Sequence, residues 1–267
     1  MNQTYQKLLD FAETDENVLG FVLVGSRGKG LVGEHSDYDC VLIVRDDFSE
    51  HFISLMSKLP PSFEVVVFTI DEFEKHADWN SKTVWDRYNW THLRAQIDKT
   101  GGKIQSMIDE KGKIPSAELE RFIKGKADHY INQVYRSIKC FRDNNLVGHH
   151  FEAVDSIQPL FDVLFAVHNG RLRPYFKYLE WELKENSLNK FPVPADDLLN
   201  AIRKIFADGC YQSQQKLFIE LEKLLRAEGY GEVFDSWGDK LTPVRHKPSK
   251  MATLFPASPP ITLNFRE

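Results

Sequence analysis

Short apolar runs alternate with polar turns over the first third of the chain. Residues 21–24 and 40–44 are apolar runs of strand length, and residues 63–70 form a third run rich in Val and Phe. Apolar runs of this length between Gly, Ser and Pro residues are typical of buried β-strands. A fourth strand is predicted at residues 92–97.

The segments before, between and after these predicted strands carry apolar residues at helical spacing. Pro60-Pro61 ends one of them, and Gly101-Gly102 gives a turn into another. Asp71 is predicted to cap one of these helices, because a side-chain oxygen before a helix accepts from its first N–H groups. The helices are expected at residues 5–12, 49–58, 72–76 and 103–110. Residues 79–90, rich in Trp and Tyr, match neither period.

Strand patterns stop at Ser116, and helical periodicity continues from there toward the C-terminus. Ser116 predicts the start of a long helix that reaches Asp143. Further helices are expected at residues 150–167, 174–186, 196–208 and 211–228, followed by a Pro-rich arm after Gly238. The sequence therefore predicts an α+β protein, with a mixed sheet and flanking helices in residues 1–112 and a helical bundle in residues 113–267.

Composition excludes some classes of partner. The 267 residues are 42% hydrophobic and 27% charged, which is ordinary for a globular protein. The formal net charge of −5 provides no basic field for gripping a long duplex, so no extended nucleic-acid surface is expected.

Cysteine usage and the N-terminus predict a cytoplasmic protein. Cys40, Cys140 and Cys210 lie far apart and form no Cys-x-x-Cys pair, which fits a reducing compartment. Residues 1–16 are too polar for a signal peptide, and no apolar run reaches membrane-spanning length. No membrane partner is expected.

The chemistry is concentrated between the first two predicted strands. The chain leaves the first strand through Gly25-Ser26 and enters the second through Asp37-Tyr38-Asp39. Residues two apart on a strand point to the same face, so the two aspartates are expected to converge. Carboxylates bind Mg²⁺, and the free N–H groups of Gly-rich turns bind phosphate. The pattern therefore indicates chemistry on a nucleoside triphosphate.

This order of strand, Gly-Ser turn, Ser-Asp-Tyr-Asp and apolar strand resembles the polymerase beta-like nucleotidyltransferase superfamily. The resemblance implies that Asp37 and Asp39 bind Mg²⁺ and that Ser26 and the nearby backbone bind the triphosphate. Many members read Gly-Ser-x-Ala-Arg-Gly, whereas here Gly-Lys-Gly follows Arg27, so that Lys29 keeps a basic residue in the turn. The predicted nucleotide-binding residues of the turn are Gly25, Ser26, Arg27 and Lys29.

Glu64 is the candidate for a third metal ligand. It stands inside the apolar run of residues 63–68, where an unpaired charge is costly. The alternative is an edge-strand residue that faces water. The resemblance favours the ligand, because the superfamily places its third acid on the next strand, and a two-metal site is then expected. Asp71 is the fallback ligand.

The C-terminal half contains a basic and aromatic helix start at residues 171–183. Arg173 and Lys177 are four apart and share a helical face, so they are predicted to bind nucleotide. The alternative is a solvated basic pair beside core aromatics. This run and residues 151–166 resemble a group of bacterial proteins related to the aminoglycoside and lincosamide nucleotidyltransferases.

Transfer of a nucleotidyl group to a hydroxyl needs a base for the proton of the acceptor. Antibiotic-modifying relatives use a carboxylate close to the metal site, in several cases from the helical region. Glu152 and Asp155 are three apart on one predicted helix, and we expect them to bind the acceptor or act as general base, with Asp155 preferred. Surface charge is the alternative role, and Asp128 is a further candidate.

The resemblance implies a Mg²⁺-dependent enzyme. The expected reaction moves an NMP group, most often AMP from ATP, to a hydroxyl of a small-molecule acceptor and releases pyrophosphate. Antibiotics are among the candidate acceptors.

Two alternatives belong to other classes. One is a toxin–antitoxin module that modifies RNA or protein, since HEPN partners of small nucleotidyltransferases carry Arg and His at the spacing of Arg142 and His149. Asn144, Asn145 and Gly148 stand between these two residues and predict a turn. The other alternative is a non-catalytic nucleotide-binding protein.

Overall fold

The computed structural model describes residues 2–246 and divides them into two compact units. The first consists of the residues up to Ile123 together with Phe165–Asn186, and the second consists of Lys124–Leu164 together with the residues from Ser187 onward. The domain boundary expected after residue 112 divides the chain at a single point, and it stays a prediction. Each unit in the structure instead contains two separate segments of the chain.

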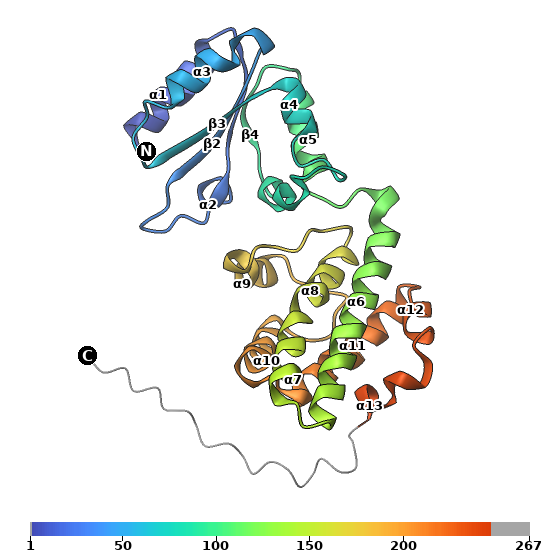
Figure 1. Cartoon of the computed structure of the whole chain (residues 1–267). Helices are drawn as coiled ribbons and strands as arrows, with labels where there is room; N and C mark the ends of the chain where they lie inside the picture. Colours follow the sequence, from blue (N-terminus) through green and yellow to red (C-terminus); the bar gives the residue numbers. More distant parts are fainter. Residues whose placement is uncertain (1, 247–267) are drawn as a thin grey trace, which may run out of the picture. The chain divides into compact units, whose positions relative to one another are not determined.

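A mixed four-stranded sheet forms the centre of the first unit (Figure 1). Its order is β3-β2-β1-β4, with β2 parallel to β3 and the other pairs antiparallel. The strands are β1 (Val18–Leu23), β2 (Tyr38–Val44), β3 (Phe63–Thr69) and β4 (Ala95–Asp98). The four predicted strands and the α+β class are confirmed.

Both faces of this sheet are covered by helices, because β1 and β2 are apolar on both sides. Phe21 and Leu42 pack with helices α1 (Gln3–Thr14) and α3 (Ser49–Met56) on one face. Val41 and Ile43 pack on the other face with residues of α4 (Ile70–Lys75) and α5 (Lys103–Lys111). Figure 1 shows these two helix layers on opposite sides of the sheet.

The start of α4 differs from the prediction. Thr69, not Asp71, is the N-cap: its hydroxyl accepts from Glu72 N at 3.2 Å, and Glu72 Oε2 accepts from Thr69 N at 2.8 Å. This capping box satisfies two N–H groups of the first turn. Asp71 lies inside the helix and is exposed.

The Trp- and Tyr-rich segment contains the 3₁₀ helix η2 (Val84–Trp90). It buries Tyr88 and Trp90 against the first unit and places Trp85 in solvent, with 68% of its surface exposed. A period of three residues explains why this segment matches neither the strand nor the α-helix pattern.

Helix α9 (Phe176–Glu185) belongs to the first unit, although it comes after Lys124–Leu164 of the second unit in sequence. The segment that leads to it pairs with the first unit through a β-bridge between Arg171 and Lys113. Tyr178, Leu179 and Leu183 are its buried apolar residues. Leu179 and Leu183 are four residues apart and share one face of the helix.

The described part of the second unit is helical. Its core includes Tyr130 of α6 (Ser116–Arg142), which stacks on Phe218 of α11 (Tyr211–Ala227) with ring centroids 6.1 Å apart. Helix α6 begins in the first unit and ends in the second. The long helices with residues in the second unit are α6 (Ser116–Arg142), α7 (Leu146–Asp155), α8 (Ile157–Ala166), α10 (Ala195–Asp208) and α11 (Tyr211–Ala227).

The single helix predicted over residues 150–167 is wrong, since α7 ends at Asp155 and α8 begins at Ile157. Pro159 explains the break. It has no N–H to donate to the carbonyl of Asp155 and would obstruct a continuous helix, but it is tolerated in the first turn of a new one. The hydroxyl of Ser156 donates to Ala153 O at 2.6 Å and covers one carbonyl at the end of α7.

The predicted C-terminal arm is only partly described. Residues 232–246 form three short helical turns, α12 (Glu232–Asp235), η3 (Gly238–Leu241) and α13 (Thr242–Arg245). Leu241 and Val244 are buried, so this stretch is packed. The rest of the arm lies outside the described residues.

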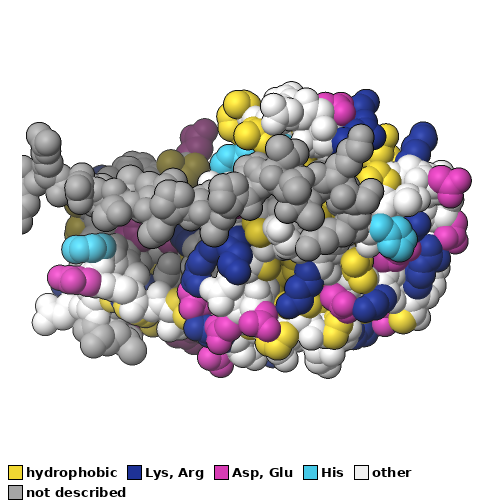
Figure 2. All heavy atoms as spheres, turned by 90° about the horizontal axis from the view of Figure 1, so that it is seen from below, with side chains coloured by type: hydrophobic (Ala, Val, Ile, Leu, Met, Phe, Trp, Pro, Cys, Tyr) yellow, Lys and Arg dark blue, Asp and Glu magenta, His cyan; other side chains and the backbone are white. Residues whose placement is uncertain are grey.

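Charge is mixed on the molecular surface. On the face drawn in Figure 2, Lys and Arg side chains lie among Asp and Glu side chains wherever described residues are visible. Between residues 2 and 246, no helix has the length and apolarity needed to cross a membrane.

Candidate active site

The Gly-Ser turn is a single helical turn, α2 (Gly25–Gly28), that follows β1 directly. Val24 N donates to Asp39 O at 2.8 Å, which ties the start of the turn to β2. The first N–H groups of any helix lack partners within the helix. The N–H groups of this turn are therefore donors of the kind that hydrogen-bond to phosphate oxygens. Gly28 fits because a side chain there would overlap Leu23 O.

Gly25 has a left-handed backbone, with φ of +61°, that disfavours other residues. A Cβ atom at this position would overlap Asp39 Oδ2 and lie 3.0 Å from Asp39 Cγ. The absence of a side chain at Gly25 therefore allows the Asp39 carboxylate to lie directly against the turn.

Asp39 and Glu64 are register partners in the parallel pair of β2 and β3. Partners in a sheet project to the same face, and both residues line one pocket. Burial raises the pKa of Asp39, and the nearby carboxylates of Asp37 and Glu64 raise it further. The structure thus brings together the three predicted acids closely enough for their charges to interact.

These acids fit a divalent cation by their chemistry. Carboxylate oxygens are the ligands that Mg²⁺ prefers, and mutual repulsion between ionised carboxylates is what such a cation relieves. Over residues 2–246, no group of three or more His, Cys, Asp or Glu side chains is arranged as a metal-ligand set. The assignment of Asp37, Asp39 and Glu64 as ligands stays a prediction.

A pocket of about 460 Å³ extends from the Gly25 turn along β2 and β3 to the segment around η2. Its floor includes Val66 and Phe68, which follow Glu64 at intervals of two along β3. The strand rises about 3.3 Å per residue, so Glu64 and Phe68 lie roughly 13 Å apart along the floor. The pocket therefore has two distinct ends.

Helix α9 also contributes residues to the lining of this pocket. Lys177 and Tyr178 line the pocket, and the charge of Lys177 lowers the pKa of Asp39 against the effects of burial and of the other acids. The Tyr178 hydroxyl lies 3.0 Å from Ser26 Oγ, at hydrogen-bond distance. Lys177, predicted from its helical spacing, and Ser26, predicted from the motif, therefore both lie at the site.

Arg27 supports the loop that leads to the carboxylates. Its Nε donates to Asp37 O at 2.8 Å and its Nη2 to Ser36 O at 2.6 Å, while the guanidinium lies 4.0 Å from the centre of the Tyr38 ring. These contacts fix the chain where it enters β2. They determine the position of Asp37.

Lys29 is directed into the protein, with 8% of its surface exposed. Its Nζ lies within hydrogen-bond distance of Tyr88 O, Asn89 O and Thr91 O, at 3.3, 3.2 and 2.5 Å. Burial lowers the pKa of Lys29 to about 8, although the carboxylate of Glu182 opposes this shift. Lys29 thus anchors the end of η2 to the Gly-Ser turn.

Arg173 precedes α9 and does not line the pocket. Its Nη1 lies 3.4 Å from Pro174 O, and its guanidinium is 5.8 Å from the centre of the Phe176 ring. Of the predicted basic pair on this segment, the structure places Lys177 beside the carboxylates.

Glu152 and Asp155 lie on α7 in the second unit, and each contacts α6. Glu152 forms an ion pair with Arg136 at 2.6 Å, and Asp155 accepts a hydrogen bond from Gln133 Nε2. Their predicted role at the acceptor stays a prediction. Asp128, the further candidate, accepts from Trp237 Nε1 at 2.8 Å.

Arg142 and His149 flank a turn, as their surroundings predict. Arg142 ends α6 and forms an ion pair with Asp143 at 3.1 Å, while His149 is buried on α7. His149 Nδ1 lies 2.9 Å from the hydroxyl of Ser137. His149 therefore has a structural hydrogen-bond partner, and the two residues share no helix.

Sequence reasoning missed the far end of the pocket. Trp85, Asp86 and Asn89 come from the segment that matched no period, and His76 follows α4. His76 Nε2 lies 2.7 Å from Asp86 Oδ2, and Asn89 Nδ2 donates to Asp86 Oδ1. The one available signal was the density of aromatic and amide side chains between residues 79 and 90.

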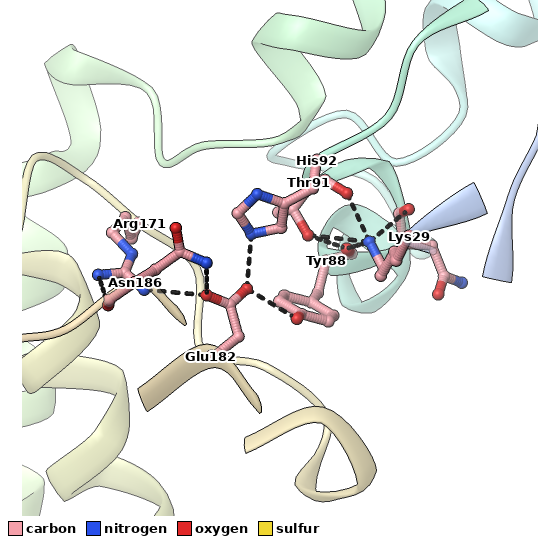
Figure 3. A network of polar contacts seen from close by, with 8 residues as sticks. Lys29, Tyr88, Thr91, His92, Arg171, Glu182 and Asn186 are labelled. Atoms are coloured by element: carbon pink, nitrogen blue, oxygen red, sulfur yellow. Dashed lines mark hydrogen bonds and ion pairs between the residues drawn. The ribbon is translucent and has the colours of Figure 1, made fainter. Parts of the chain in front are cut away.

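Glu182 was also missed. It is a charged residue on α9 with 2% of its surface exposed, and its carboxylate accepts hydrogen bonds from three segments of the first unit. Figure 3 shows it between Arg171 and Asn186 on one side and Tyr88 and His92 on the other.

Comparison with known families assigns the N-terminal part of the chain. Residues 5–116 match the family model for the nucleotidyltransferase domain. This match covers the Gly25 turn, Asp37, Asp39 and Glu64. The matched residues therefore contain the carboxylate end of the pocket, while Lys177 and Tyr178 lie outside them.

A search of curated proteins finds no significant match to the chain. Among solved structures, a nucleotidyltransferase-like protein from Exiguobacterium sibiricum 255-15 is similar, with 11% identity, a TM-score of 0.42, and coverage of 91% of this chain and 86% of that one.

Proposed function

We propose that the protein is a metal-dependent nucleotidyltransferase that moves an NMP group from a nucleoside triphosphate to a hydroxyl of a small-molecule acceptor. The observation that carries this proposal is the pairing of Asp39 with Glu64 on adjacent parallel strands, in a pocket that begins at the Gly25 turn. The domain match at residues 5–116 supports the reaction class.

The residues of the chain have distinct tasks in this proposal. The Gly25-Ser26 turn binds the triphosphate through its backbone N–H groups, and Lys177 adds a positive charge opposite the acids. Asp37, Asp39 and Glu64 hold Mg²⁺. Bound there, Mg²⁺ would neutralise phosphate charge and align the acceptor oxygen with the leaving pyrophosphate.

In this proposal Arg27 and Lys29 hold the elements around the pocket in place. Arg27 fixes the loop before Asp37, and Lys29 fixes η2, which carries the far wall of the pocket. Asp155, with Glu152 beside it, is proposed to take the proton of the acceptor hydroxyl. ATP is the proposed donor, and aminoglycosides and lincosamides are the first acceptors to test.

The test is incubation of the protein with each of the four labelled ribonucleoside triphosphates, Mg²⁺ and a panel of hydroxyl-bearing acceptors that includes both antibiotic classes. Mass spectrometry then measures the acceptor plus one NMP, together with release of pyrophosphate. The doubly substituted variant Asp37→Asn/Asp39→Asn is the matched control. An adduct formed equally by this variant would contradict the proposal.

A further inference from the structure

We propose that Glu182 is a positioning residue for nucleotide binding. It holds helix α9 so that Lys177 and Tyr178 face the Gly25 turn and the carboxylates. This inference rests on the proposed function, since it concerns how the triphosphate is bound.

The buried carboxylate of Glu182 has hydrogen-bond partners on both oxygens. Tyr88 OH donates to Oε1 at 2.8 Å and His92 Nε2 lies 2.7 Å from the same atom. Arg171 Nη2 donates to Oε2 at 2.9 Å, and Asn186 Nδ2 lies 3.3 Å from it. Both oxygens are therefore satisfied.

These contacts keep Glu182 ionised. Burial by itself raises the pKa of a carboxyl group, but the hydrogen bonds and charges of His92, Tyr88 and Arg171 together hold the pKa of Glu182 below its ordinary value. A buried charge of this kind is costly to leave unpaired, so the groups that contact it are held in place as well.

The network joins α9 to two other parts of the pocket. Tyr88 lies on η2, the element that carries Trp85 and Asp86 at the far end. The same Tyr88 supplies a backbone carbonyl to Lys29, which lies just after the Gly-Ser turn. Figure 3 shows Lys29, Tyr88 and Glu182 in succession from the turn to the helix.

The position of Glu182 on α9 links its hydrogen bonds to the residues that line the pocket. Tyr178 and Glu182 are four residues apart and share one buried face of α9. Tyr178 reaches Ser26 Oγ, and its neighbour Lys177 lines the pocket beside Asp39 and Glu64. A rotation or shift of α9 would move both side chains together, because the helix is one rigid element.

A purely structural role for Glu182 predicts a different result from a positioning role. Loss of a structural contact lowers stability and weakens nucleotide binding by the same factor whether or not Lys177 is present. A positioning role makes the two residues interdependent, since Glu182 then acts through Lys177. A double-mutant cycle separates these cases.

The experiment measures the Kd of the α,β-methylene analogues of the four ribonucleoside triphosphates with Mg²⁺, without turnover, and uses the analogue that wild type binds most tightly. We expect Glu182→Gln to raise this Kd about tenfold in the wild-type background and less than about twofold in Lys177→Ala. Glu180→Gln is the matched control, because Glu180 is exposed on the same helix and pairs with Lys184.

Tyr88→Phe covers the case in which Glu182→Gln does not fold. It keeps the ring and removes the hydroxyl that donates to Glu182, so we expect a rise of about threefold in Kd that again disappears in Lys177→Ala. An equal effect in both backgrounds, or no effect in the wild-type background, would overturn the positioning role alone. Failure of wild type to bind any of the four analogues would instead overturn the proposed function and this inference with it.

Discussion

Gly25 and Asp39 are in such close contact that residue 25 has no room for a side chain. A Cβ atom there would overlap Asp39 Oδ2, and the backbone at Gly25 has a φ of +61°. The contact joins the turn that follows β1 to the carboxylate at the start of β2. In the proposed enzyme, this places the triphosphate and the metal ligands within one site.

Gly25→Ala is therefore expected to displace Asp39 and lower NMP transfer at least about 100-fold, together with a stability cost of about 1–2 kcal/mol from the left-handed backbone. Gly101→Ala is the matched control. Gly101 has a similar φ of +72° and no atom within 4 Å of a built Cβ, so it carries the strain without the clash. Equal activity of the two variants would refute the importance of the contact; steady-state rates and urea unfolding measure both effects.

Asp39→Asn is expected to lower activity by about 1,000-fold or more, since charge stabilisation by a bound metal contributes several kcal/mol. The same variant is expected to raise the free energy of unfolding at neutral pH. Burial and the nearby acids raise the pKa of Asp39, so its ionised form destabilises the folded state, and this effect disappears as the pH falls through the folded pKa.

Asp37→Asn should lose activity in the same way, whereas Asp46→Asn, at an exposed site, should change neither property. Thermal unfolding at pH 7 and rates with Mg²⁺ provide the measurement. Full activity in both Asp37→Asn and Asp39→Asn would eliminate these residues as metal ligands.

Lys177→Ala is expected to raise the KM for the triphosphate about tenfold or more, as the loss of one charge-assisted contact would. The variant also changes the pH profile. The charge of Lys177 lowers the pKa of Asp39, so its removal raises that pKa and moves the acid limb of the rate profile to higher pH. Lys184→Ala, on the exposed side of the same helix, is the control and should leave the acid limb unchanged. An unchanged acid limb in Lys177→Ala would show that the charge of Lys177 does not affect the pKa of Asp39.

Lys29 gives wild type a pH-dependent stability. Its folded pKa of about 8 lies below the ordinary lysine pKa of 10.5, so the unfolded chain binds more protons between these values and stability rises with pH. The expected gain from pH 7 to pH 9 is on the order of 1 kcal/mol. Urea unfolding of wild type and Lys29→Met at several pH values gives the free energy of unfolding of each. The difference between their slopes against pH measures the contribution of Lys29.

Lys29→Met is also expected to destabilise the protein at pH 7 by about 1–3 kcal/mol, because three backbone carbonyls lose a donor. Equal slopes of unfolding free energy against pH for wild type and the variant would contradict the lowered pKa of Lys29.

Asp155→Asn distinguishes a general base from a structural acid. A base lost from the reaction lowers kcat by about 100- to 10,000-fold, leaves the KM for the triphosphate unchanged and removes one limb of the pH profile. Glu152→Gln and Asp128→Asn are tested beside it, with Asp128→Asn expected to keep full activity. Unchanged kcat in Asp155→Asn and Glu152→Gln would transfer the role to another group.

Much of the fold follows from local patterns. Strands β1 to β3 and most helices lie where apolar periodicity predicts them, because period 2 and period 3.6 are properties of short segments. The division of α7 from α8 depends on one proline, and the cap of α4 depends on whether Thr69 or Asp71 reaches the N–H groups of the first turn. The exact ends of these helices depend on single side chains, and apolar periodicity does not fix them.

The sequence by itself determined the Gly25 turn and the pair of Asp37 and Asp39 at the start of β2, because residues two apart along a strand point to the same face. It also marked Glu64 as a charge inside an apolar strand, and the structure makes Glu64 the register partner of Asp39. Tertiary structure decided the rest of the pocket. It directed Lys29 inward to the carbonyls of η2 and placed Lys177 beside the acids. These outcomes depend on contacts between segments up to about 150 residues apart, and helical or strand periodicity carries no information on such distances.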